Sequence, residues 1–161
     1  MESKVKLAGH PVHPMLIVLP LGLFISAVVF DGAYIWRGSP TWATVAFWNI
    51  GAGVVTGLLA AVFGIVDWLA IPAGTRAKRV GLTHGLTMVV TVLLFAAVWL
   101  MRRNVDGVTP TTTLYALEVV ALVAGAFGGW LGGELVDRLG VGVTDGANLN
   151  APSSLSGRPV R

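Results

Sequence analysis

The stretch His10-Pro11-Val12-His13-Pro14, followed by the apolar segment MLIVLPLGLFISAVVFDGAY from Met15 to Tyr34, organises the rest of the sequence. Each histidine stands directly before a proline, which disfavours helical backbone at the residue that precedes it. Proline itself suits the first turn of a helix, where its missing N–H costs no hydrogen bond. The stretch therefore predicts a helix that begins near Pro14. His10 and His13 would lie on a stiff, extended lead-in at a membrane boundary, either as ligands or as interfacial residues.

The composition is that of an integral membrane protein. Of the 161 residues, 55% are apolar and only 12% are charged, whereas a soluble domain carries about 25% charged residues. Several uncharged apolar runs of about 20 residues can each cross a bilayer as a helix. The net charge of +3 does not indicate nucleic acid binding, because the basic residues flank the apolar runs. The chain has no cysteine, which excludes disulfides and thiolate metal sites.

The apolar runs and the turns between them predict an all-α, integral membrane four-helix bundle with short loops. A lead-in over residues 1–13 precedes one domain over residues 14–139, and a tail over residues 140–161 follows. The four spans are expected at about residues 14–36, 41–71, 81–101 and 111–136. Pro20 should kink the first span, which is too long for a cleaved signal peptide. The tail is rich in Gly, Asn, Ser and Pro, so we expect it to be flexible and disordered.

Charge asymmetry predicts the orientation of the chain. Four spans place both termini and the loop between the second and third spans on one side. That side carries Lys4, Lys6, Arg76, Lys78, Arg79, Arg138, Arg158 and Arg161, and the other carries Arg37, Arg102 and Arg103. Loops rich in Lys and Arg stay on the cytoplasmic side, so both termini are expected to be cytoplasmic.

The same end carries the residues whose side chains could bind a ligand or take part in a reaction. These are His10, His13, His84, Asp67, Glu134 and Asp137. An ionisable residue within a span is costly and indicates a functional site. Asp67 and His84 should lie at similar depth, where the carboxylate would either orient a ligating imidazole or form a plain buried hydrogen bond. Glu134 and Asp137 are expected to be interfacial residues at a helix end.

At the opposite end, Asp31 and Asn49 fall at similar depth in the first two spans. We expect them to hydrogen-bond across that hairpin, or Asp31 to pair with Arg37, in either case as a structural contact. Four tryptophans towards this end are consistent with an aromatic belt at the membrane interface, namely Trp36, Trp42, Trp48 and Trp99.

Glycines at four-residue spacing predict close helix contacts. The fourth span carries Gly125, Gly129 and Gly133, with Gly128 and Gly132 beside them, and the second carries Gly53, Gly57, Ala60 and Gly64. Small residues allow helices in lipid to approach closely. These faces would pack against neighbouring helices, or would take a flat cofactor against the backbone.

Several of these motifs together resemble a known family. They are the His10-Pro-x-His13-Pro opening, Asp67-Trp68, the run Ile71-Pro72-x-Gly74-Thr75-Arg76-Ala77 before His84-Gly85, and the ending Gly132-Gly133-Glu134 with Gly140-Val141-Gly142-Val143. In this order they resemble the bacterial four-helix membrane proteins grouped as domain of unknown function 2231. In some members an asparagine follows the third histidine, whereas here the polar positions are Thr87 and Thr91.

The resemblance implies a place in membrane electron transfer, because some relatives are joined to Rieske-type or cytochrome c-type domains. The expected cofactor is a b-type haem near the cytoplasmic face, with His84 as one axial ligand and His10 or His13 as the other. Asp67 would orient His84. The haem propionates would meet cationic side chains, which are Lys6, Arg76, Lys78 and Arg79.

Two other functions fit the same residues. His10, His13 and His84 with a carboxylate could bind a Zn, Fe or Mn ion without a porphyrin. The chain could also be a non-catalytic structural subunit whose histidines only cap and hydrogen-bond, so enzymatic activity stays open. The expected surroundings are the lipid bilayer of the bacterial cytoplasmic membrane, a redox partner protein or membrane complex, and further copies of the chain.

Overall fold

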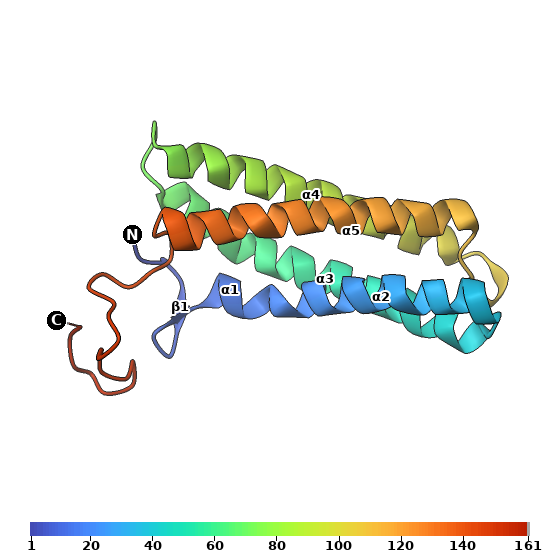
Figure 1. Cartoon of the computed structure of the whole chain (residues 1–161), viewed down its shortest axis with the longest axis horizontal. Helices are drawn as coiled ribbons and strands as arrows, with labels where there is room; N and C mark the ends of the chain where they lie inside the picture. Colours follow the sequence, from blue (N-terminus) through green and yellow to red (C-terminus); the bar gives the residue numbers. More distant parts are fainter. Residues whose placement is uncertain (161) are drawn as a thin grey trace.

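The structure, a computed structural model, describes residues 1–160 as a bundle of long helices with both termini at one end (Figure 1). The elements in chain order are β1 Lys6–Leu7, β2 His10–Pro11, α1 Val12–Leu16, α2 Val18–Arg37, α3 Pro40–Ala70, α4 Arg76–Arg102, η1 Asp106–Val108, α5 Thr112–Gly133 and the π-helical turn η2 Glu134–Arg138. We call the end with the two termini the terminal end and the other the loop end. The predicted all-α four-helix architecture is confirmed.

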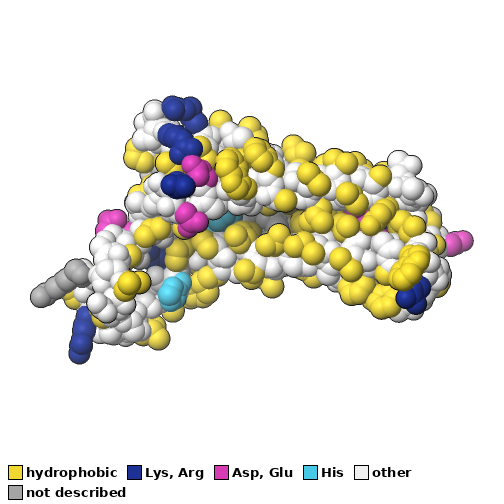
Figure 2. Space-filling view, in the orientation of Figure 1, with side chains coloured by type: hydrophobic (Ala, Val, Ile, Leu, Met, Phe, Trp, Pro, Cys, Tyr) yellow, Lys and Arg dark blue, Asp and Glu magenta, His cyan; other side chains and the backbone are white. Residues whose placement is uncertain are grey.

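Within residues 1–160, four helical segments are long and apolar enough to cross a membrane, namely Val12–Arg37, Pro40–Ala70, Arg76–Arg102 and Thr112–Arg138. The longest has 31 residues and spans about 46 Å, more than the roughly 30 Å of a hydrocarbon core. It must therefore tilt or protrude. Large apolar side chains point outward from every long helix, and Figure 2 shows them covering the visible face between charged ends. This surface contacts the lipid bilayer.

The helices pack as a four-cornered bundle. Helix α2 packs along α3, α3 along α4, and α4 along α5, so α2 and α4 face each other across the diagonal. Phe24 from α2 and Phe95 from α4 stack there with ring centroids 4.0 Å apart. This apolar stack lies between the polar residues of the terminal end and those of the loop end.

The first span begins earlier than predicted and is interrupted close to Pro20, where a kink was expected. His13 is already helical, in the first turn of α1, where backbone N–H groups lack helical partners and Pro14 loses no hydrogen bond. The regular helix is interrupted at Ile17, between α1 and α2 and one turn before Pro20. Pro20 causes this break, because it has no N–H for the carbonyl four residues earlier, at Leu16.

The third span also begins earlier than predicted, at Arg76 rather than Gly81. Thr75 caps this helix, since its side chain accepts a hydrogen bond of 3.1 Å from the backbone N–H of Lys78. Gly74 turns the chain into the helix with a φ of +78°, which favours glycine. The expected basic loop is therefore the first turn of α4.

The glycine face of α5 is packed only in part as predicted. A Cβ on Gly125 or Gly128 would meet Thr91 or Met88 of α4, at 3.2 and 2.5 Å, whereas Gly129 and Gly133 have nothing within 4 Å. The inward face therefore follows a spacing of three and four residues, as on any helix with one buried side. The glycines of α3 behave as predicted, since a Cβ on Gly53 would lie 2.6 Å from the Phe24 ring.

Candidate functional site

Two of the three histidines meet inside the terminal end. His13 comes from the short helix α1 and His84 from the third turn of α4, and their ring centroids lie 6.5 Å apart with the ring planes at 87°. Both side chains are partly buried. The bundle diagonal thus brings together residues 71 positions apart in the sequence.

Each imidazole of this pair is held by a backbone carbonyl. His13 Nδ1 lies 2.8 Å from the carbonyl oxygen of Ala60 on α3, and His84 Nδ1 lies 2.7 Å from that of Gly128 on α5. A carbonyl oxygen only accepts, so each Nδ1 carries the hydrogen. In the neutral ring the unprotonated nitrogen is then Nε2, the form in which histidine binds a metal.

Glycines make room for both rings. A Cβ on Gly64 of α3 would lie 2.9 Å from His13 Cε1, and a Cβ on Gly132 of α5 would lie 3.3 Å from His84 Cε1. A side chain at Gly64 would force the His13 ring to move, and one at Gly132 would crowd the His84 ring. The glycines of α3 and α5 therefore set the positions of the two imidazoles.

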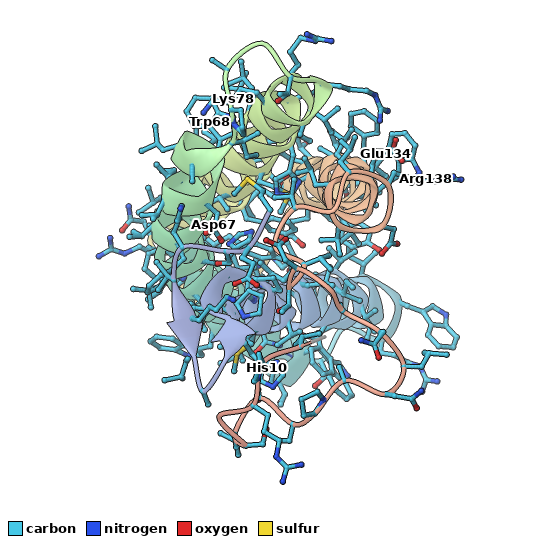
Figure 3. All side chains as sticks on the ribbon, turned by 90° about the vertical axis from the view of Figure 1, so that its left-hand side faces the viewer. His10, Asp67, Trp68, Lys78, Glu134 and Arg138 are labelled. Atoms are coloured by element: carbon cyan, nitrogen blue, oxygen red, sulfur yellow. The ribbon has the colours of Figure 1, made fainter. Side chains whose placement is uncertain are left out.

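His10 is not part of this pair. It lies in β2 of the exposed hairpin, and its Nε2 is 3.4 Å from the Ser154 hydroxyl of the tail. Antiparallel pairing of Leu7 with His10 keeps the residue on the hairpin, and Figure 3 shows it well apart from Asp67 on α3. The expected set of three histidines is therefore not assembled: His13 and His84 meet, and His10 does not.

The predicted pairing of Asp67 with His84 is wrong. The Asp67 carboxylate accepts from the Ser3 hydroxyl, at 2.8 and 2.9 Å, and from the Lys4 backbone N–H at 2.7 Å. The N-terminal segment lies across this carboxylate and satisfies it, while the His84 ring bonds α5. Asp67 thus fastens the N-terminus to α3 instead of orienting an imidazole.

The four cations expected to meet haem propionates lie at the terminal end, where Lys and Arg gather on the visible face (Figure 2). Lys6 pairs with Glu2, and this hydrogen bond lowers the pKa of the Glu2 carboxyl. Arg76 pairs with Glu134 at 2.6 Å.

The other two cations are bound to backbone oxygens. Lys78 donates to the Trp68 carbonyl at 2.6 Å and lies over the Trp68 ring; Figure 3 labels the two residues at the same corner of the bundle. Arg79 makes a longer bond of 3.4 Å to the Gly74 carbonyl and is exposed. Arg79 is therefore the least engaged of the four.

The histidine pair offers two imidazole ligands, without the further protein ligands of a typical metal site. Residues 1–160 contain no group of three or more His, Cys, Asp or Glu that could share a metal ion. The ring centroids lie 6.5 Å apart, so one metal with bonds of about 2 Å could be shared if both Nε2 atoms faced it. The fixed tautomers suit the same use.

A second polar cluster, which the sequence patterns did not predict, lies at the loop end. Arg102 of α4 is 0% exposed and donates to both carboxylate oxygens of Asp31 on α2, at 2.5 and 3.0 Å. It also donates to Glu118 of α5 at 3.2 Å and to the carbonyls of Ala43 and Val108 at 3.0 and 2.8 Å. One guanidinium therefore joins α2, α3, α5 and the η1 turn. We call Asp31, Arg102 and Glu118 the buried triad.

Asp31 bonds Arg102 of the buried triad and neither of its predicted partners, Asn49 and Arg37. Asn49 donates to the Ser26 hydroxyl at 3.0 Å, and Arg37 stacks over Trp36. Both contacts are local to the α2–α3 hairpin, which leaves Asp31 free to face α4.

A helical repeat could have revealed the position of Arg102. His84 and Arg102 are 18 residues apart, and this spacing equals five turns of about 3.6 residues. An inward His84 therefore implies an inward Arg102, although Arg102 was expected among the loop cations. Glu118 is a carboxylate inside a span, which is a signal by itself.

Comparison with known proteins gives a family and one more distant similarity. Residues 9–145 match the profile described as "Predicted membrane protein (DUF2231)". The chain is also 30% identical over 108 residues to a glycerol-3-phosphate acyltransferase of Rhizobium meliloti (strain 1021), which covers 66% of this chain and 51% of that protein. The chain thus spans about half the length of that relative. No solved structure matches the chain significantly.

Proposed function

The chain belongs to the DUF2231 family of predicted membrane proteins, and we propose that it is a small electron-transfer protein of the bacterial cytoplasmic membrane that binds one b-type haem through His13 and His84. The observation that carries this proposal is the histidine pair, with ring centroids 6.5 Å apart and each Nδ1 held by a carbonyl. A haem ligated by these two imidazoles would supply one-electron chemistry.

The residues of this chain would set the properties of such a site. The carbonyls of Ala60 and Gly128 fix the imidazole tautomers and raise the basicity of Nε2. Gly64 and Gly132 let α3 and α5 approach the rings. Arg79, which is exposed on the first turn of α4, would pair with a propionate, because carboxylates at a membrane interface need cationic partners.

Absorption spectroscopy tests the proposal directly. The protein is produced in haem-replete cells, purified in detergent, and its visible spectrum is recorded before and after reduction with dithionite. We expect a Soret band that shifts on reduction, and a loss of that band in His13→Ala and in His84→Ala. Size-exclusion chromatography shows whether each variant is folded.

His10→Ala is the matched control, because His10 lies on the exposed hairpin and makes only a 3.4 Å contact with Ser154. It should keep the full haem content. A colourless wild-type protein would refute haem binding, and a His10→Ala variant that loses haem while His13→Ala keeps it would refute His13 as a ligand. Metal analysis of a colourless preparation would then test for a bare ion on the histidine pair.

The proposed orientation places both termini in the cytoplasm. Since the chain has no cysteine, a single Ser153→Cys substitution in the tail gives a unique label site. A membrane-impermeant maleimide should label this variant only after the cells are broken. Labelling in intact spheroplasts would show the opposite orientation.

A further inference from the structure

The buried triad contains more negative than positive charge. Asp31 and Glu118 both bond Arg102, and they reach the same nitrogen, Nη1, at 2.5 and 3.2 Å. Helix α3 and the η1 turn contribute only the carbonyls of Ala43 and Val108. If both carboxyl groups are ionised, one guanidinium faces two negative charges, and each side chain is 0% exposed.

The two carboxyl groups differ in how many hydrogen bonds they accept from Arg102. Asp31 takes both of its oxygens to the guanidinium, so it forms the bidentate pair that suits an ionised carboxylate. Glu118 uses only Oε1, through the longer bond, while Oε2 is buried with no hydrogen-bond partner. A buried carboxylate oxygen without a partner is unfavourable.

All five N–H groups of Arg102 are used. Nε bonds Val108, Nη1 bonds Asp31 and Glu118, and Nη2 bonds Asp31 and Ala43. Arg102 therefore has no donor left for Oε2 of Glu118. The nearest other titratable group on α5 is Tyr115, one turn earlier, whose hydroxyl lies against Gly32.

We propose that Glu118 is a proton-binding site at the loop end. Asp31 neutralises the charge of Arg102, and Glu118 takes up one proton on Oε2. Two carboxylates that share one site do not both stay ionised, because the second charge is repelled by the first. The proton adds to Oε2 and forms the O–H bond of a carboxylic acid, and its release restores the carboxylate. A metal cation fits less well, because such ions need several oxygen ligands and Oε2 is the one buried oxygen without a partner among the side chains of residues 1–160.

Infrared spectroscopy tests the proposal. The protein is reconstituted in lipid nanodiscs, and the C=O stretching region is recorded in H2O and in D2O. At neutral pH we expect a protonated carboxyl band that shifts in D2O and is lost in Glu118→Gln. Glu134→Gln is the matched control, since Glu134 is an interfacial glutamate paired with Arg76, and it should leave the band unchanged.

The Asp31→Asn variant shows whether Glu118 is protonated because Asp31 already pairs with Arg102, or merely because Glu118 is buried. Without the Asp31 carboxylate, Glu118 becomes the counter-ion of Arg102 and should lose its proton, so the band should disappear although Glu118 is present. A band that persists in Asp31→Asn would overturn the proposal, as would its absence from the wild type or its removal by added sodium ions.

A thermal measurement keeps the test valid if Asp31→Asn does not fold. Glutamine has the shape of a protonated glutamate, so Glu118→Gln should unfold at the wild-type temperature. A marked fall in its unfolding temperature would show that Arg102 needs a charged Glu118, and would overturn the proposal. Each of these results is independent of haem binding at the other end.

Discussion

Replacing Arg102 by methionine should destabilise the protein severely. The substitution keeps much of the aliphatic volume but removes five hydrogen bonds that join α2, α3, α5 and the η1 turn to α4. Asp31 would then be a buried carboxylate with no cation. Removal of one partner of a buried ion pair costs about 3–5 kcal/mol, and we expect a loss of that size because Arg102 and both of its carboxylate partners are fully buried.

The neighbouring arginine provides the control. Arg103 is exposed and lies over the Trp99 ring at 5.7 Å, so Arg103→Met should change the free energy of unfolding by less than about 1 kcal/mol. The two variants have the same change in composition, one residue apart. Denaturant titration in mixed micelles, followed by tryptophan fluorescence, measures both.

The compensated variant identifies the cause. Combining Arg102→Met with Asp31→Leu removes the buried charge together with its partner, and should recover most of the lost stability, because apolar replacements of buried ion pairs are often neutral. A loss below about 1 kcal/mol for Arg102→Met would refute the proposed role of the triad. So would a compensated variant no more stable than the single one.

Three further predictions concern the terminal end. Gly64→Ala should displace His13, whose ring would lie 2.9 Å from the new Cβ, and should lower the free energy of unfolding by about 1–3 kcal/mol. Gly129→Ala is the control, because its Cβ would have nothing within 4 Å, and it should be neutral or stabilising in the same denaturant titration. Asp67→Asn should weaken the hold on the N-terminal segment, so limited proteolysis should cut the first ten residues faster than in the wild type; an unchanged rate would show that Asp67 does not fasten them. Thr75→Ala should remove the N-cap of α4 and lower stability by about 1 kcal/mol, and no change would indicate that the bond from Lys78 contributes nothing.

The histidine pair and the buried triad differ in which atoms they leave free to bind a ligand or a proton. In the histidine pair each Nδ1 is bound to a carbonyl, which leaves each Nε2 with its lone pair for a ligand. Arg102 has no spare donor, and the buried triad is mainly a cross-link whose remaining capacity is one oxygen of Glu118. The Phe24–Phe95 stack lies between the two sites, so a direct hydrogen-bonded path from one to the other is interrupted by apolar side chains.

Several features of the candidate site followed from local sequence patterns. Apolar length predicted the spans, and the proline after His13 predicted a helix start close to the observed one, at Val12. The depth of His84 on α4 placed it at the same end as His13. Depth is readable because it depends only on position along a helix and on the rise per residue.

Partners across the bundle did not follow from those patterns. His84 was expected beside Asp67 because the two lie on helices joined by a short loop, yet it bonds Gly128 of α5, and Asp67 bonds Ser3. Depth gives the level of a residue in the membrane, but the partner depends on the rotation of each helix about its axis. That rotation is set by close packing of small residues between helices.

The sequence by itself determined a membrane protein of four apolar helices with its histidines at one end, because hydrophobic length and the cost of charge in lipid act on each segment separately. Only the tertiary structure decided that His13 rather than His10 meets His84, and that Arg102 is buried rather than interfacial. The physical reason is that both outcomes depend on the diagonal between the α1–α2 segment and α4. That diagonal exists only after α3 and α5 have packed against them.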